Sequence, residues 1–319
     1  MVGTFDKVRL GISTCLLGEK VRYDGQHKLD TFLRDTLGRF VEYVAVCPEV
    51  ECGLPIPREA MRLEGDPENP RLMTHKTRRD LTEMQQAWGR RRLQDLESEN
   101  LDGYIFKSKS PSSGLFRVKV YQESGMPVKQ GVGIWAKMFT EKFPLLPVEE
   151  EGRLNDPVLR ENFIERIFVM RRWREMLAEN NTRGGLVDFH TRHKYLILAH
   201  SQKAYADLGR IVAGMKGRTL ADVQKEYLAI LMPALELEAT VKKNVNVLQH
   251  LAGYFKKQLS GDEKKEMTEV LAEYARGSIP LIVPVTLIRH YVRKYGEAYL
   301  ANQWYLHPHP LELQLRNHA

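Results

Sequence analysis

The stretch VRLGISTCLLG, residues 8–18, decides the fold of the first half of the chain. Its first part, Val8–Ser13, has the β-rich composition of a short strand, which runs directly into a loop that carries Cys15. Tyr43–Cys47 (YVAVC) and Gly103–Lys107 (GYIFK) give two further strand signals. Continuous apolar runs of this kind are typical of strands that are buried on both faces of a sheet.

Helix signals alternate with these strands. The spacing of apolar residues predicts helices over Lys28–Glu42, Thr77–Ser98 and Gly133–Phe143, and a further strand over Arg117–Tyr121. Alternating strands and helices are typical of a parallel sheet with right-handed crossovers. We therefore predict an α/β domain with a mostly parallel, Rossmann-like sheet at residues 1–150.

The pattern changes after the acidic, proline-containing stretch Pro144–Asn155. Asp156 and Pro157 are residue types that favour the start of a helix. Amphipathic patterns then cover 156–177, 186–214, 219–258, 262–276 and 284–299, and we expect Pro233 to kink or split the third of them. These patterns predict an all-α domain at residues 151–319.

Length and composition agree with two soluble domains. The chain has 319 residues, of which 43% are hydrophobic and 28% charged, and this balance excludes wholesale disorder. No apolar run approaches the roughly 20 residues that cross a bilayer, and the N-terminal residues lack the apolar core of a secretion signal. We expect a cytoplasmic protein with reduced thiols, no membrane association and no obligate protein partner.

All three cysteines lie at or after the ends of predicted strands. The carboxyl ends of parallel strands meet at one edge of a sheet, so Cys15, Cys47 and Cys52 are expected near one another. Three thiols are too few for the usual structural zinc site, and the spacing of Cys47 and Cys52 is not that of a CxxC redox pair. Three interpretations remain from the residues alone: buried structural thiols, a catalytic Cys15 with His27, or a [4Fe–4S] cluster with one iron left open.

The motifs around these cysteines are ISTCLLG (12–18), VRYDG (21–25), CPEV (47–50), GLP (53–55), PR (57–58) and SPS (110–112). Together they resemble the TudS family of thiouracil desulfidases. The later segments GRLND (152–156) and ENFIER (161–166) resemble the helical domain of YbgA proteins. A fusion of these two domains is the architecture of the RudS-type tRNA 4-thiouridine desulfidases, and the resemblance covers essentially the whole chain.

The resemblance implies a non-redox reaction, the desulfuration of 4-thiouridine in tRNA to uridine. In that family the open iron of a [4Fe–4S] cluster captures the sulfur, which is released as sulfide. No NAD, flavin or ATP is expected, and the nicotinamide and flavin fingerprints are absent from the sequence. The alternatives are a desulfidase of free thiouracil or thionucleotides, and a non-catalytic RNA-binding protein whose cysteines are structural or hold zinc.

The resemblance also assigns residues. Cys15 and Cys47 match two cluster ligands of the family, and Glu49 matches an acidic residue beside the cluster, a general base or acid whose alternative role is a hydrogen bond within the loop. The family's third loop usually reads SPSCG, whereas this chain has Ser113 at the cysteine position. We predict that Cys52 supplies the third thiolate instead. The alternative is Ser113 as an oxygen ligand, which matches iron less well because oxygen is the harder donor.

Further positions are predicted to hold the substrate. Ser110 and Ser112 are expected to position the pyrimidine or the attacking water, although Ser-Pro-Ser is also ordinary turn chemistry. The predicted substrate-binding residues are Arg22, Tyr23 and Asp24 at the mouth of the pocket, and Lys107 and Lys109 beside it.

The positive charge is unevenly distributed. Residues 1–150 contain 23 Lys and Arg against 22 Asp and Glu, whereas residues 151–319 contain 25 against 19. This excess favours tRNA binding by the helical half. The predicted RNA contacts are Arg166, Arg171, Arg172, Arg192 and Lys194, interleaved with the aromatic residues Phe163, Trp173 and Tyr195. The alternative is that the aromatic rings belong to the core and the arginines to a solvated face.

Overall fold

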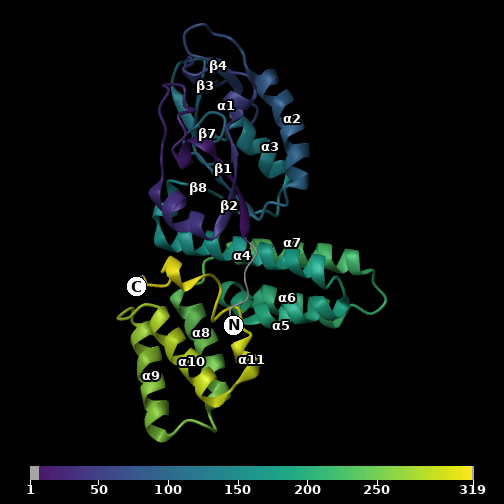
Figure 1. Cartoon of the computed structure of the whole chain (residues 1–319), viewed down its shortest axis with the longest axis vertical. Coiled ribbons are helices and arrows are strands. Elements are labelled where there is room, and N and C mark those ends of the chain that lie inside the picture. Colours follow the sequence, from purple (N-terminus) through teal and green to yellow (C-terminus); the bar gives the residue numbers. More distant parts are fainter. Residues whose placement is uncertain (1–6, 318–319) are drawn as a thin grey trace. The chain divides into compact units, whose positions relative to one another are not determined.

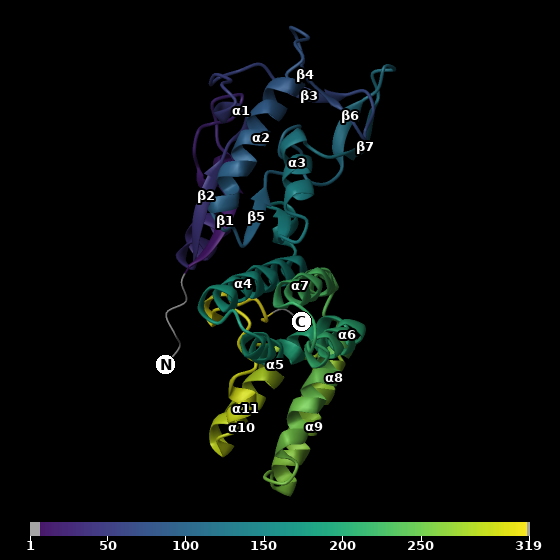
Figure 2. The same cartoon turned by 90° about the vertical axis from the view of Figure 1, so that its right-hand side faces the viewer.

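The computed structural model describes residues 7–317, and the chain forms two compact units, Met1–Asp156 and Pro157–Ala319 (Figures 1 and 2). The first unit combines two sheets with helices, and the second is helical. The fold class predicted from the sequence, an α/β domain followed by an all-α domain, is confirmed.

The first sheet consists of β1 (Val8–Ser13), β2 (Val41–Val46), β5 (Gly103–Phe106) and β8 (Val148–Glu150). Its order is β2-β1-β5-β8, and every neighbouring pair is parallel. β5 is buried along its whole length, as predicted. β2, however, is an edge strand with Glu42 and Ala45 exposed, so the prediction that Tyr43–Cys47 is buried on both faces is wrong.

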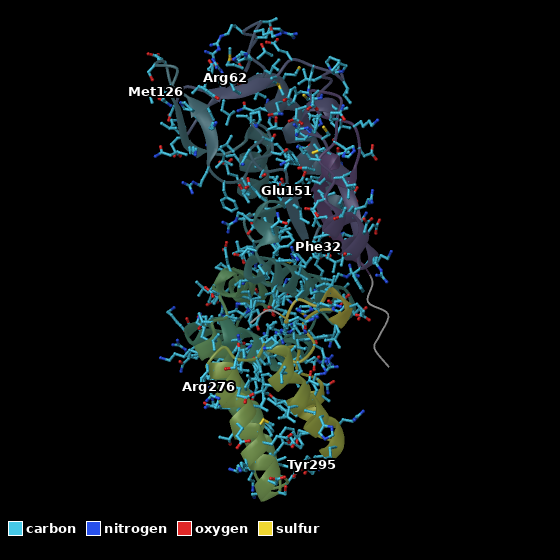
Figure 3. The ribbon with its side chains drawn as sticks, turned by 90° about the vertical axis from the view of Figure 1, so that its left-hand side faces the viewer. Phe32, Arg62, Met126, Glu151, Arg276 and Tyr295 are labelled. Atoms are coloured by element: carbon cyan, nitrogen blue, oxygen red, sulfur yellow. The ribbon has the colours of Figure 1, made fainter. Side chains whose placement is uncertain are left out.

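The second sheet is smaller and mixed. It contains β3 (Met61–Glu64), β4 (Arg71–Thr74), β6 (Val118–Tyr121) and β7 (Pro127–Gly131), in the order β4-β3-β6-β7. β6 is the strand predicted at Arg117–Tyr121, but it lies outside the parallel sheet and pairs with β7 as an antiparallel hairpin. Figure 3 shows Met126 at the outer end of this hairpin, where its side chain is 73% exposed.

Two helices cover one face of the first sheet (Figure 2). α2 (Thr82–Ser98) and α3 (Ile134–Lys142) pack together, and their apolar side chains share one core with β5. This core includes Trp88, Trp135, Phe139, Tyr104 and Phe106. Each large buried aromatic ring removes extensive apolar area from water, and the contact fixes β5 relative to the helices.

The helix predicted at Lys28–Glu42 does not form. The chain makes only a π turn at Phe32–Thr36 and a 3₁₀ turn at Leu37–Arg39 before β2 begins at Val41. Val41 pairs with Val8 in the sheet. The end of the segment is therefore a strand, because sheet pairing outweighs the helical preference of the local sequence.

The second unit has eight α-helices among its described residues: α4 (Pro157–Glu179), α5 (Arg183–His200), α6 (Gln202–Ala213), α7 (Leu220–Glu236), α8 (Val241–Ala252), α9 (Gly261–Ala275), α10 (Ile282–Tyr295) and α11 (Ala298–Ala301). The predicted helices at 186–214 and 219–258 are each divided in two. The second division follows Glu236, whereas Pro233 lies within α7; of the two expected outcomes at Pro233, a kink or a split, the split is wrong. Hydroxyl groups at the N-caps of α6 and α8 start the new helices at these divisions.

Within residues 7–317, no helix combines the length and the apolar composition that crossing a bilayer requires.

Candidate functional site

A cavity of about 420 Å³ lies where three strands of the parallel sheet end. The register aligns Ser13 with Val46 and Ile12 with Ile105, so β1, β2 and β5 finish at the same edge. The lining residues come mainly from the segments that follow these strands. The hydroxyl group of Ser13 accepts a hydrogen bond from the Lys107 N–H at 2.9 Å, which joins the ends of β1 and β5. The structure therefore brings together three loops that the sequence placed at one edge.

Two thiols lie in this cavity. Cys15 belongs to the 3₁₀ turn after β1, and Cys47 links β2 to the short helix α1 (Pro48–Glu51); each is 8% exposed. Burial raises the pKa of Cys15 to about 11, although Lys107 and Arg22 oppose the shift, and it raises the pKa of Cys47 to about 12, with Glu49 adding to the effect. Both thiols are therefore protonated near neutral pH, and their thiolates need a bound cation.

The alternative of a Cys15–His27 nucleophile gains no support from the geometry. His27 does not line the cavity; its Nδ1 accepts a hydrogen bond from the Leu29 N–H at 3.2 Å in an exposed turn. A catalytic cysteine needs a base within hydrogen-bond reach and a lowered pKa, and the pKa of Cys15 is raised.

Cys52 is placed differently from the other two cysteines. It follows α1, does not line the cavity, packs against the core beneath α2 and α3, and donates a hydrogen bond to the Glu49 carbonyl at 3.3 Å. Ser113 lines the cavity in its place. Among residues 7–317, no three His, Cys, Asp or Glu side chains are gathered closely enough to hold a metal ion. Cys52 does not join Cys15 and Cys47 because the helical turn of α1 lies between Cys47 and Cys52 and places the Cys52 side chain against the core.

Glu49 and Arg58 are neighbours on the cavity wall. The Glu49 Oε2 atom lies 3.5 Å from the Cys47 sulfur and 3.9 Å from an Arg58 guanidinium nitrogen. Arg58 is nearly buried and donates to the Val21 carbonyl at 3.0 Å, which fixes the preceding loop. Its Nε has no hydrogen-bond partner among the described residues. Arg58 belongs to the PR motif (57–58), but no role was predicted for it, since nothing in the sequence shows that its side chain reaches the cavity.

The Ser110 hydroxyl shapes the third loop. It accepts hydrogen bonds from the N–H groups of Ser112 and Ser113 at 3.2 and 3.1 Å, and it lines the cavity. Its own O–H remains able to donate toward a ligand. The site role predicted for Ser110 therefore has the required placement, together with the turn role that was its alternative.

Ser112 has no direct access to the cavity, so its predicted catalytic role is wrong. Its side chain is fully buried and accepts a hydrogen bond from Gln85 at 2.8 Å. Its carbonyl accepts the Trp135 N–H at 2.9 Å, which ties the loop to the first turn of α3. A Cβ atom at Gly133 would lie 2.4 Å from this carbonyl, so only glycine permits the contact.

The predicted substrate-binding residues divide into two groups. Arg22, Tyr23 and Lys109 line the cavity, and Tyr23 is 44% exposed, as a stacking surface requires. Asp24 does not line it: its carboxylate accepts the Gln26 N–H at 3.1 Å, which lowers its pKa and stabilises the turn. Asp24 therefore stabilises the turn, and its predicted substrate role gains no support from the lining of the cavity.

Lys107 also differs from its prediction, although it lines the cavity. Its ammonium group is bonded to Glu151, which follows β8, and to the Ser108 carbonyl at 3.1 Å. A paired ammonium group is not free to meet a phosphate. Lys107 instead acts on the cavity as a fixed positive charge, and it lowers the pKa of Cys15 against the effect of burial.

The predicted RNA contacts of the helical unit are mostly occupied within it. Arg166 and Arg172 are buried, and the Arg172 guanidinium lies 3.7 Å from the centre of the Trp304 ring. Arg171 and Arg192 pair with Glu175 and Asp188, each at 2.9 Å. The predictions for Arg166 and Arg172 are therefore wrong.

The remaining predicted RNA contact, Lys194, lies over the rings of Tyr195 and Tyr299. The interleaved aromatic residues Phe163, Trp173 and Tyr195 are buried in the core. The alternative that the sequence left open, aromatic rings in the core, is the observed one.

Comparisons with known proteins agree with this division of the chain. Residues 10–151 match the family described as 2-thiouracil desulfurase, and residues 194–310 match a family described as a protein of unknown function, DUF1722. The uncharacterized protein YbgA of Escherichia coli (strain K12) is 33% identical over 153 residues, which are 48% of this chain and 90% of YbgA. A solved [4Fe-4S]-dependent thiouracil desulfidase, TudS, is 29% identical and covers 47% of this chain and 95% of its own, with a TM-score of 0.39.

Proposed function

The chain belongs to the family of YbgA and joins a 2-thiouracil desulfurase domain to a DUF1722 domain, and on that premise we propose that it desulfurates 4-thiouridine in tRNA. Water supplies the oxygen that replaces sulfur at the base, uridine is formed, and the sulfur leaves as sulfide, so no electron donor or acceptor is needed. One observation carries the proposal: Cys15, Cys47 and Glu49 line one cavity at the carboxyl edge of the parallel sheet.

The donor set of the cavity fits an iron–sulfur cluster. Cys15 and Cys47 would hold it, because buried thiols with raised pKa values become stable thiolates only against a metal. Lys107, Arg22 and Arg58 supply positive charge that offsets the charge of the thiolates. When bound, a [4Fe–4S] cluster with one open iron supplies a soft Lewis acid for the sulfur of a thio base.

We assign the third ligand to Cys52, although its sulfur is turned toward the core. Glu49 and Arg58 both act on the pKa of Cys52, as they do on that of Cys47, so the two thiols share their charged neighbours. Cys52 is only partly buried, and its hydrogen bond to the Glu49 carbonyl is a weak one because a thiol is a poor donor. Rotation of this side chain is therefore a small cost compared with a metal–thiolate bond.

The side chains of the cavity would orient the base and the water. The exposed Tyr23 ring offers a surface on which a pyrimidine can stack, with Arg22 beside it. The Glu49 carboxylate, held between Cys47 and Arg58, is placed to take a proton from the attacking water. The Ser110 O–H can donate to a carbonyl oxygen of the base, because its lone pairs already accept two backbone N–H groups.

The test uses full-length protein purified without oxygen. It is incubated separately with 4-thiouridine-containing tRNA and with free 4-thiouracil, and the loss of thio-base absorbance is followed. We expect a brown protein that acts on the tRNA, and a Glu49→Gln variant that keeps the colour but loses about 10²–10⁴-fold in rate. Glu42→Gln, at the other end of β2, is the matched control and keeps full activity. Activity on free 4-thiouracil but not on the tRNA would show that the free base is the substrate. A colourless protein that contains stoichiometric zinc would refute the proposal.

The ligand assignment has its own pair of variants. Cys52→Ala is expected to lose the cluster absorbance, whereas Ser113→Ala keeps it. The reverse result would assign the third position to Ser113, which lines the cavity as the protein stands. Iron and sulfide analysis of both variants gives a second readout that does not depend on activity.

A further inference from the structure

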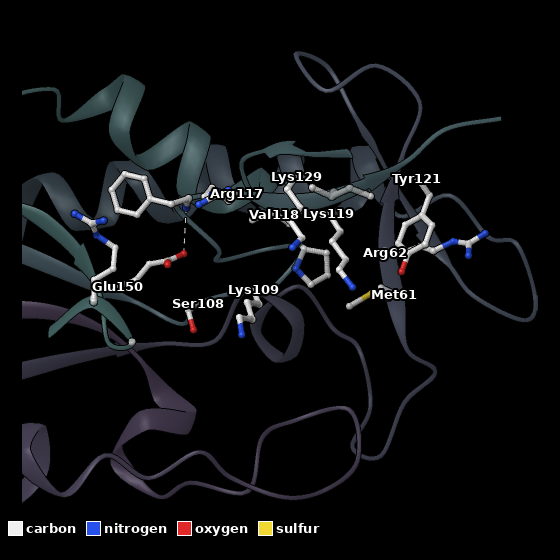
Figure 4. A pocket seen from close by; sticks show the side chains of 15 residues that line it. Met61, Arg62, Ser108, Lys109, Arg117, Val118, Lys119, Tyr121, Lys129 and Glu150 are labelled. Carbon is white, nitrogen blue, oxygen red and sulfur yellow. Dashed lines mark hydrogen bonds between the residues drawn. The ribbon is translucent and has the colours of Figure 1, made fainter. Parts of the chain in front are cut away.

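A second cavity, of about 930 Å³, adjoins the one described above. The two cavities share the lining residues Met61, Ser108, Lys109 and Pro111, so they lie next to each other on the first unit. We use the name basic groove for the part of the second cavity lined by Lys109, Phe116, Arg117, Lys119, Tyr121 and Lys129 (Figure 4). Lys109 is also a predicted substrate-binding residue; neither the proposed chemistry nor the family matches assign a role to the other five.

The cations of the basic groove make no ion pairs with the part of the chain that the structure describes. Lys109, Arg117, Lys119 and Lys129 are exposed, and none of the four makes an ion pair within residues 7–317. The other two cations of the same cavity are paired, Arg62 with Glu64 at 2.6 Å and Arg153 with Glu149 at 2.8 Å.

The acidic residue that lines the cavity does not offset these charges. The Glu150 carboxylate is buried and accepts the N–H groups of Leu115 and Phe116 at 2.8 and 3.1 Å. Within the lining of this cavity, no free carboxylate thus compensates the four cations, and such a concentration of positive charge favours a polyanion.

Lys119 and Lys129 face each other directly across the β6–β7 hairpin. Figure 4 shows the two side chains extending from the same side of the paired strands. Like charges at directly opposed positions destabilise a hairpin. A lysine on the edge strand β7 is explained by protection against edge-to-edge association. That reason does not apply to Lys119, because β6 is an inner strand of the sheet.

Two aromatic rings lie among these cations. Phe116 is 40% exposed, and the Arg153 guanidinium lies 4.7 Å from its ring centre. The Arg62 guanidinium lies 4.6 Å from the centre of the Tyr121 ring. Rings and guanidinium planes are the surfaces on which unpaired bases stack, whereas the side chains of an acidic peptide carry no aromatic ring to stack on them.

We propose that the basic groove binds the backbone of a single-stranded RNA segment next to the base that enters the catalytic cavity. The inference rests on the proposed function for the identity of that base, and it places RNA binding on the α/β domain itself. Lys109 lines both cavities and therefore stands where the strand would pass from one to the other. The unpaired cations would contact phosphates, and Phe116 and Tyr121 would stack on flanking bases.

The test measures binding of a fluorescent single-stranded oligouridine that contains no sulfur, so it is independent of desulfuration. Lys119→Gln/Lys129→Gln in the full chain is expected to weaken binding about tenfold near 0.1 M salt and to reduce the slope of log K against log salt by about 1.4, since each contact to a single strand contributes about 0.7. The control Arg39→Gln/Arg91→Gln removes the same charge from exposed positions of this domain that line neither cavity.

Weaker binding would not reflect loss of folding. The Lys119→Gln/Lys129→Gln variant removes a repulsion between like charges, so it should be at least as stable as the parent protein. Phe116→Leu should weaken binding with no change in the salt slope, since stacking is not ionic. Equal losses in groove and control variants, or binding of poly-glutamate as tight as that of RNA, would overturn the proposal. If the parent protein binds oligouridine but does not desulfurate 4-thiouridine-containing tRNA, the proposed function fails and the inference about the basic groove still stands.

Discussion

The chain contains two sets of basic residues that differ in what they contact. In the α/β domain, four cations of the basic groove are exposed and unpaired within residues 7–317, although this half is nearly neutral overall. In the helical unit, which has the positive excess, Arg172 and Arg316 are buried and Arg171 and Arg192 are paired with acidic neighbours. Net charge therefore does not by itself locate a binding surface, because buried or paired cations are not available to a ligand.

The difference also separates two kinds of energetic role. A buried, paired cation is tied to folding, because its partner cannot be removed without leaving a charge in the core. An exposed, unpaired cation adds little to folding and is available to a ligand. Variants of the two sets should therefore change different measurements.

The largest change in the free energy of unfolding is expected on substitution of Glu165 in α4. Its carboxylate lies 2.6 Å from His200 and 3.3 Å from Arg316, and all three side chains are buried. Glu165→Ala leaves the Arg316 charge with Glu161 alone and should lower the free energy of unfolding by about 3–5 kcal/mol. Urea unfolding of the full chain measures this change. Glu175→Ala on the same helix removes a partly exposed partner of Arg171 and should cost under about 1 kcal/mol. Equal effects of the two variants would contradict a structural role for the buried network.

The sequence predicted the parallel sheet and the convergence of its loops, because buried apolar runs and strand-end motifs are local signals. It could not predict that Cys52 turns toward the core or that Ser112 is held by Gln85, since both depend on packing against α2 and α3. The basic groove was missed for a similar reason. Lys109, Lys119 and Lys129 are separated in sequence, and only the pairing of β6 with β7 and the return of the third loop bring them together.

An intermediate loss of folding stability is expected on acidification, and it should be confined to the helical unit. Burial lowers the pKa of His190 and of His309 to about 4, so each is neutral when folded, and the unfolded chain takes up protons first as pH falls from 6.5 toward 4. Stability is therefore lost in that window, by about 1–2 kcal/mol per histidine at pH 5. Although burial opposes it, attraction by His200 and Arg316 holds the pKa of Glu165 at about 2, and its contribution is lost only as pH falls from 4.5 toward 2.

Hydrogen exchange of the full chain, corrected for the intrinsic rate at each pH, resolves the two units. Between pH 7 and pH 5, amides of α5 should lose protection while those of β5 and α3 keep it. His309→Gln should flatten the pH dependence in the helical unit, because it removes one of the groups that must take up a proton. Simultaneous loss of protection in both units would show that the buried histidines do not set the acid response.

The smallest effect is expected for Arg192→Gln, and its comparison with Arg117→Gln tests the difference between the two sets of cations most directly. Arg192 is an exposed arginine like Arg117, but it pairs with Asp188, and the cavity beside it is also lined by Glu175 and Glu179. Arg192→Gln should change stability by less than about 0.5 kcal/mol and leave oligouridine binding and its salt slope unchanged. Arg117→Gln, the matched loss of one charge in the groove, should reduce the slope by about 0.7. If Arg192→Gln reduced the slope as much as Arg117→Gln, the acidic neighbours would not screen Arg192 from the RNA, and the pairing of cations would not distinguish the surfaces. Because the two variants lose the same side chain and the same charge, a difference between them can come only from the surroundings of each arginine.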